Sequence, residues 1–152
     1  MIVSGELESL IAEELASPPP AAVAAIAKAA RTRHGEGVRA VLFYGSCYRD
    51  GIVEDRLVDL YLLADSYRRV HPGWLSAWAN RLVPPNVYYL ETPFEGRMVR
   101  AKYAIVSLDQ LAEKVLPRTL NPYFWARFAQ PTGLVWAADA ASRERVVEIL
   151  AQ

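Results

Sequence analysis

The chain has 152 residues, of which 53% are hydrophobic and 22% charged, which predicts one globular domain with a sizeable core rather than two domains. Its 17 basic and 17 acidic side chains balance, so no overall field attracts nucleic acid and a polynucleotide partner is disfavoured. Cys47 is the only cysteine, which excludes an intramolecular disulfide and a cysteine-based zinc site and suits a reducing compartment. We expect neither a signal peptide nor a membrane span, and therefore a cytoplasmic protein.

Two helices are expected before the first strand. Apolar residues at helical spacing run from Leu7 to Leu15, and three successive prolines then stop the pattern. Residues 21–33 are rich in alanine, which favours a helix, and Val23 and Ile26 give this segment an apolar face. The N-terminal part of the chain therefore predicts packed helices rather than a linker.

Two strands follow, at residues 38–44 and 57–64. Both are almost continuously apolar, which is typical of strands covered on both faces of a sheet. Helices are therefore expected to pack on each side of them.

The rest of the chain alternates helices and strands. Proline and glycine mark most of the boundaries, and Ser107 with Gln110 has the spacing of a capping box at a helix start. The further elements predicted are helices at 72–82, 107–116, 122–128 and 140–150, and strands at 86–91, 98–107 and 134–136.

These elements predict an α/β (α+β) fold with a mixed central sheet of four to five strands and helices packed around it. We expect one domain over residues 1–152. Within it, residues 1–34 form the N-terminal helices, 38–137 the core that carries the chemistry, and 138–152 a C-terminal helix.

The first strand runs directly into Gly45 and Ser46, and the second carries Asp59 in its apolar middle. Glycine allows a sharp turn that brings backbone N–H groups close to an anion. Ser46 adds a hydroxyl at a candidate helix N-terminus, which makes phosphate the expected ligand. A buried carboxylate is costly without a partner, so Asp59 is a candidate metal ligand. This arrangement resembles the signature of the DNA polymerase β nucleotidyltransferase superfamily. The resemblance implies the minimal form of that superfamily's fold.

The superfamily usually carries two further acids. Strand alternation places Tyr61 on the same face as Asp59, at the position where the second acid usually stands. The third typically comes from the next strand of the sheet, and Glu91 is the candidate. Mg²⁺ accepts one or two carboxylates and completes its shell with water and phosphate, so nearby acids could substitute. These substitutes are Glu54, Asp55 and Asp65.

A longer resemblance covers residues 44–131. It is carried, in order, by Tyr-Gly-Ser at 44–46, Val-Asp at 58–59, Asn-Val-Tyr-Tyr at 86–89, Arg-Ala-Lys-Tyr-Ala-Ile-Val-Ser at 100–107 and the segment 123–131. These motifs resemble the nucleotidyltransferase domain of the mitochondrial translocator-maintenance type of CDP-diacylglycerol synthase, a phosphatidate cytidylyltransferase. That family tolerates an apolar or aromatic residue where Tyr61 stands. The chain departs from it at Cys47, Ala104 and Ala126, where the family prefers glycine.

The resemblance implies roles for individual residues. Ser46, next to Gly45, would contact the triphosphate, Asp59 would bind Mg²⁺, and Lys102 would neutralise phosphate charge, which makes Ser46, Asp59 and Lys102 the catalytic candidates. Lys102 also stands out because a lysine in an apolar strand needs an anionic partner, unless it reaches the sheet edge. Two more candidates for nucleotide binding are Arg100, on the same face as Lys102, and Arg127.

The expected activity is Mg²⁺-dependent transfer of CMP from CTP to phosphatidate or a similar phosphorylated acceptor, with release of pyrophosphate. Two alternatives stay open: a non-catalytic nucleotide-binding module, and an antitoxin-type enzyme that AMPylates a protein. The family enzymes continue into a second, helical domain, so an oligomer or a partner chain is one expected way to complete the acceptor site. A basic-aromatic patch for peripheral contact with the inner face of a membrane is predicted at Arg68, Arg69, Trp74 and Trp78.

Overall fold

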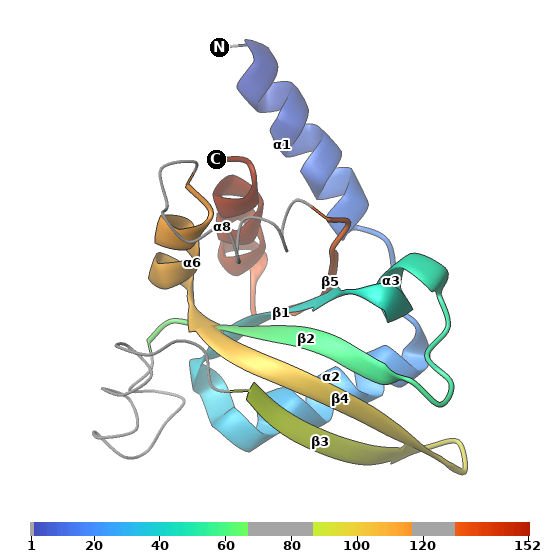
Figure 1. Ribbon diagram of the computed structural model, residues 1–152. Coiled ribbons are helices and arrows are strands. Elements are labelled where there is room, and N and C mark those ends of the chain that lie inside the picture. The colour runs from blue at the N-terminus through green and yellow to red at the C-terminus, as the bar shows by residue number, and fades with distance from the viewer. Residues whose placement is uncertain (1, 67–86, 117–129) are drawn as a thin grey trace.

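The structure is a computed structural model that describes residues 2–66, 87–116 and 130–152 (Figure 1). Five strands form one sheet in the order β3-β4-β2-β1-β5. They are β1 (Val38–Tyr44), β2 (Leu57–Ala64), β3 (Val87–Phe94), β4 (Arg97–Ser107) and β5 (Gly133–Ala137). β2 and β4 run parallel, whereas the other three neighbouring pairs are antiparallel. The predicted α+β fold with a mixed sheet is confirmed.

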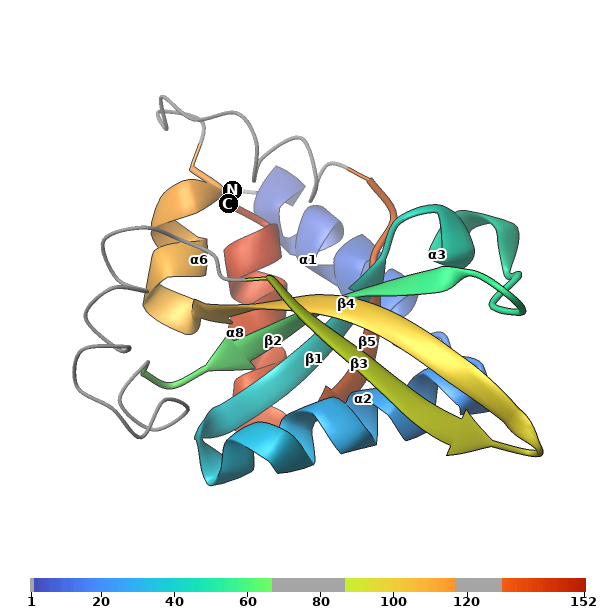
Figure 2. The same cartoon turned by 60° about the horizontal axis from the view of Figure 1, so that its bottom comes forward.

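Helices cover both faces of this sheet. α2 lies along one face, and α6, α8 and the C-terminal end of α1 lie on the other (Figure 2). The bounds are α1 (Ile2–Leu15), α2 (Ala21–His34), α3 (Ser46–Asp50), α6 (Leu108–Lys114) and α8 (Ala140–Leu150), with a 3₁₀ turn at η1 (Gly35–Gly37).

The side chains of β2 contribute to two separate cores. Val58, Leu60 and Leu62 pack in the core formed with α2, while Tyr61 and Leu63 pack in the core formed with α6 and α8. All five side chains are buried. Alternation along a strand sends neighbours to opposite faces, so burial on both faces explains the continuous apolar run.

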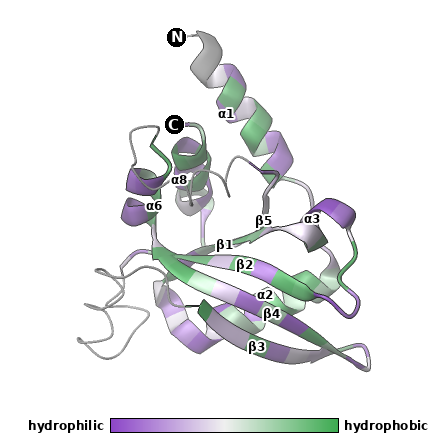
Figure 3. Ribbon diagram, viewed as in Figure 1, coloured by the Kyte–Doolittle hydropathy of each residue, from purple (hydrophilic) through white to green (hydrophobic). Residues whose placement is uncertain are grey.

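The N-terminal half of β4 is covered on one face only. Val99 and Ala101 are buried toward α2, whereas Met98, Arg100 and Lys102 are exposed on the opposite face. In Figure 3, hydrophobic residues dominate β1 and β2, whereas polar residues are frequent in β3. The sheet therefore presents a polar surface beside its buried centre.

Most predicted boundaries are confirmed to within three residues. β1 and β2 have the predicted ends, as does α8. The predicted N-cap is present, because the Ser107 hydroxyl accepts a hydrogen bond from the Gln110 N–H at 3.2 Å. The five-residue α3 begins at Ser46, where a helix N-terminus was expected, but its extent was not predicted. The helices predicted at 72–82 and 122–128 lie outside the described residues.

The start of α8 yields a prediction on pH. The Asp139 side chain caps α8 by accepting the Ser142 N–H at 2.7 Å, and it pairs with Arg39. Hydrogen bonds from Ser142, and then the Arg39 charge, lower the pKa of Asp139. The stabilisation is therefore complete above the unfolded pKa of about 3.9 and is lost as the pH falls through the lower folded value.

We accordingly expect Asp139→Ala to lower the free energy of unfolding at pH 7, with the difference from wild type shrinking below about pH 4. Urea denaturation across this range measures it. Asp139→Asn is the control because an amide caps the helix without titrating. A wild-type advantage over Asp139→Ala that stays constant down to pH 2 would contradict the charged cap.

Candidate functional site

The turn after β1 depends on the backbone of Gly45. This residue has φ +86° and ψ −161°, a conformation that is essentially restricted to glycine. α3 begins at the next residue, and the exposed Ser46 side chain faces solvent. The predicted Gly-Ser turn is therefore present, with the serine accessible.

Asp59 packs directly against this turn. It stands opposite Tyr44 in the antiparallel pairing of β1 with β2, and a Cβ placed on Gly45 would lie 2.5 Å from Asp59 Oδ2. Only 14% of the Asp59 side chain is exposed. Gly45 is thus required twice, for its backbone conformation and for the space that the carboxylate occupies.

Lys102 provides the counter-charge for Asp59. The two residues are direct neighbours in the parallel pairing of β2 with β4, and Lys102 Nζ lies 3.1 Å from Asp59 Oδ1. The lysine is 46% exposed, so its ammonium group also reaches solvent. The expectation that Lys102 needs an anionic partner is confirmed, and the partner is the other candidate predicted from the sequence.

Two further candidates, Glu91 and Arg100, lie on the same side of the sheet as Asp59 and Lys102, which we call the open face. It comprises the outward side chains at the starts of β2 and β4 and along β3. Its members are Leu57, Asp59, Tyr89, Glu91, Met98, Arg100 and Lys102.

Glu91 is not on the strand beside Asp59. β4 lies between β2 and β3, and Glu91 stands opposite Arg100 on β3, where it accepts a hydrogen bond from the Tyr89 hydroxyl at 2.5 Å. Arg100 donates to the Asp55 carbonyl at 3.3 Å. The strand that does neighbour β2 presents Lys102 at the position level with Asp59, so this position carries a cation instead of a third acid.

Two of the three substitute acids, Glu54 and Asp65, are engaged in ion pairs with other residues. Glu54 pairs with Arg97 at 2.6 Å, and Asp65 pairs with Arg39 beyond the opposite end of β2. Within residues 2–66, 87–116 and 130–152, no group of three or more His, Cys, Asp or Glu could hold a metal ion.

Asp59 alone nevertheless fits a hard cation. One of its oxygens faces Lys102, and the other lies over the Gly45 Cα without a hydrogen-bond donor from the described part of the chain. Mg²⁺ prefers carboxylate oxygen and binds through as few as one carboxylate when substrate phosphates and water complete its shell. The donor set therefore suits a metal that arrives with a phosphate ligand.

Tyr61, where the superfamily's second acid usually stands, has a packing role. Its ring stacks on that of Tyr44 with centroids 4.8 Å apart, and only 1% of the residue is exposed. This aromatic pair lies beside Asp59 on β1 and β2 and packs in the core formed with α6 and α8.

Cys47 is buried and donates its thiol to the Leu57 carbonyl at 3.4 Å. Burial, followed by the negative charge of Asp59, raises the pKa of this thiol. A protonated, enclosed thiol is a poor nucleophile, so Cys47 fills space in the core beside the turn.

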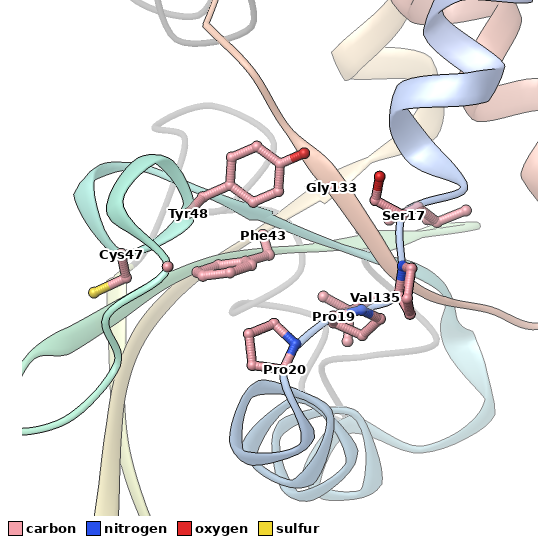
Figure 4. Close-up of a pocket in the computed structure, with 11 residues that line it drawn as sticks. Ser17, Pro19, Pro20, Phe43, Cys47, Tyr48, Gly133 and Val135 are labelled. Atoms are coloured by element: carbon pink, nitrogen blue, oxygen red, sulfur yellow. The ribbon is translucent and has the colours of Figure 1, made fainter.

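A pocket of about 240 Å³ lies on the other side of β1, beneath α3 (Figure 4). The prolines between α1 and α2 form one wall, and Phe43, Tyr48 and Gly133 contribute to the others. A Cβ on Gly133 would lie 2.7 Å from Tyr48 Cε2, so the tyrosine ring needs a glycine there. The sequence signal, three successive prolines, predicted only the end of a helix.

His34 also gains a partner that the sequence did not suggest. Its Nε2 lies 2.8 Å from the hydroxyl of Tyr103, which is buried on the α2 side of the sheet. Burial raises the pKa of Tyr103. This hydrogen bond satisfies a buried hydroxyl and ties the end of α2 to β4.

Five candidates fall outside the described residues: Arg68, Arg69, Trp74, Trp78 and Arg127. No helix in the part of the chain that the structure describes is long and apolar enough to cross a membrane. Comparison with known proteins found no matching family model and no matching curated protein.

Proposed function

We propose that the protein binds a nucleoside triphosphate at the Gly45 turn and is a nucleotidyltransferase. The observation that carries this proposal is the Asp59–Lys102 pair, whose charges lie 3.1 Å apart beside the turn and at the edge of the open face. A carboxylate for a metal and an ammonium group for phosphate are the two charges that phosphoryl chemistry requires of a protein. The favoured reaction is transfer of CMP from CTP to phosphatidate or a similar phosphorylated acceptor.

Each residue then has a defined task. The Ser46 hydroxyl and the Lys102 ammonium group bind the triphosphate, Arg100 adds positive charge two residues along β4, and Asp59 holds Mg²⁺. Bound Mg²⁺ supplies neutralisation of the charge on the transferring phosphoryl group. The acceptor phosphate oxygen attacks the α-phosphorus of CTP and the bond to pyrophosphate breaks. Because that oxygen is already anionic, no strong protein base is needed.

A non-catalytic nucleotide-binding module is the second candidate. It is favoured by one observation: in the described residues Asp59 belongs to no group of three or more potential metal ligands, and Lys102 already pairs with it. Such a site could retain phosphate recognition without enough charge for catalysis.

Nucleotide binding is tested by thermal denaturation. We expect CTP with Mg²⁺ to raise the melting temperature more than ATP or GTP with Mg²⁺ at equal concentration, because a ligand that binds only the folded state stabilises it. A nucleotide concentration a hundredfold above the dissociation constant corresponds to about 2.7 kcal/mol of stabilisation. No shift with any nucleotide would remove the site assignment, and a larger shift with ATP would favour the AMPylating enzyme.

Transfer is tested with CTP labelled at the α-phosphate, Mg²⁺ and phosphatidate vesicles, with a soluble sugar phosphate as the control acceptor. Labelled CDP-diacylglycerol is the expected product, and its formation should weaken with salt because a peripheral protein meets anionic lipid electrostatically. Product with the sugar phosphate alone would support cytidylyl transfer and exclude phosphatidate as the acceptor. CTP binding without either product would favour the non-catalytic module.

A further inference from the structure

The Asp59–Lys102 pair has an unusual distribution of exposure. Asp59 is only 14% exposed and is held by the turn at Gly45, whereas Lys102 is 46% exposed at the end of a flexible stem. Lys102 Nζ lies 3.1 Å from one carboxylate oxygen of Asp59. The carboxylate is thus the fixed member of the pair, and the ammonium group is the one that can move away.

A metal ion at Asp59 would compete with this ammonium group. Ligand distances to Mg²⁺ are about 2.0–2.1 Å, so a metal on this carboxylate and an ammonium group still paired with it would lie within a few ångströms of each other. Like charges that close repel strongly and are not screened by salt, because their separation is below the Debye length of about 8 Å. Arg100 adds a further positive charge on the same face of β4.

A triphosphate reverses this balance. It brings several negative charges, which attract Lys102 away from Asp59 and also supply oxygen ligands to the metal. The exposed half of the lysine side chain leaves it room to turn from the carboxylate toward the open face.

We propose that Lys102 excludes free divalent cations from Asp59, so that the metal enters only together with the triphosphate, to which Lys102 then turns. Lys102 therefore couples the metal site to nucleotide binding. This inference rests on the proposed function for the identity of the anion, but its first prediction needs no nucleotide.

The test is Mn²⁺ binding in the absence of nucleotide. The electron paramagnetic resonance signal of the free ion measures how much Mn²⁺ remains unbound. Mn²⁺ takes the same oxygen ligands as Mg²⁺. We expect Lys102→Met to bind Mn²⁺ at least about tenfold more tightly than wild type, because the like charge is gone and the carboxylate is unpaired. Mn²⁺ should also raise the melting temperature of this variant more than that of wild type.

Two controls isolate the effect. Lys28→Met makes the same change at an exposed position on α2, on the other side of the sheet, and should bind Mn²⁺ as weakly as wild type. Lys102→Met combined with Asp59→Asn should lose the gain, because the carboxylate is removed. If Lys102→Met folds poorly, Lys102→Gln provides the same loss of charge with a polar side chain.

The outcomes separate this inference from the proposed function. Equal Mn²⁺ affinity in wild type and Lys102→Met would overturn the inference, even if wild type binds CTP with Mg²⁺. If Lys102→Met gains Mn²⁺ affinity but the protein binds no nucleotide, exclusion of the metal by Lys102 would be supported and the proposed nucleotide binding would be wrong. With both intact, Lys102→Met should bind CTP in EDTA about ten- to a hundredfold more weakly than wild type, since a charge-assisted phosphate contact is lost.

Discussion

Replacing Gly45 with alanine is expected to lower the free energy of unfolding by about 2–4 kcal/mol and to disrupt the candidate site. Two costs combine at this position. The backbone conformation, φ +86° and ψ −161°, is strained for any residue with a Cβ, and that Cβ would lie 2.5 Å from Asp59 Oδ2. Relief of the contact would move Asp59, which is fixed between β1 and β4. Urea denaturation measures the loss of stability.

Gly51 is a matched control because it stands at the other end of the same helix. It also has a positive φ, +69°, but a Cβ there would meet nothing within 4 Å. Gly51→Ala should therefore cost only the left-handed backbone term, about 1–2 kcal/mol, and leave nucleotide binding intact. If both variants lost the same stability, the contact between Gly45 and Asp59 would have no energetic consequence.

The second large effect is expected for Asp59→Asn, which should abolish the dependence of nucleotide binding on Mg²⁺. The amide keeps the shape of the side chain beside Gly45 but removes the charge that holds a metal. The affinity for CTP, measured by calorimetry with Mg²⁺ and with EDTA, should differ for wild type and be the same for the variant. Stability should fall by no more than about 1 kcal/mol, since the partner Lys102 reaches solvent.

Asp50→Asn provides the control for this experiment. Asp50 lies at the end of α3 and forms an exposed ion pair with Arg56 at 2.7 Å. Loss of this carboxylate should leave both affinities unchanged. Metal-dependent CTP binding by Asp59→Asn at the wild-type level would show that the metal is held elsewhere.

The elements that could be predicted from the sequence are those whose signals are local. The apolar runs of β1 and β2, the cap at Ser107 and the packed face of α2 each depend on a short segment, and all four are present. Only the start of α3 at Ser46 could be predicted, because this five-residue helix is too short to show a helical period. The fold class followed from the order of these elements.

Within the candidate site, the turn could also be predicted, as could the need of Asp59 and Lys102 for charged partners. That these two residues contact each other could not. Strand order is a property of the assembled sheet, and β4 rather than β3 lies beside β2. The position level with Asp59 therefore carries Lys102, while Glu91 lies on the far strand. A residue pattern identifies charges that need partners, and only the three-dimensional arrangement identifies the partners.

The parallel pairing of β2 with β4 has a consequence for folding. The hairpin of β3 and β4 closes through a two-residue turn, whereas β2 and β4 are separated in sequence by more than thirty residues that include β3. Closing such a long loop is slow because chain entropy is lost before the strands make contact. Asp59 and Lys102 therefore come together only when the non-local part of the sheet has formed. The ion pair therefore forms only in the completely folded sheet, and a partly folded chain lacks the assembled candidate site.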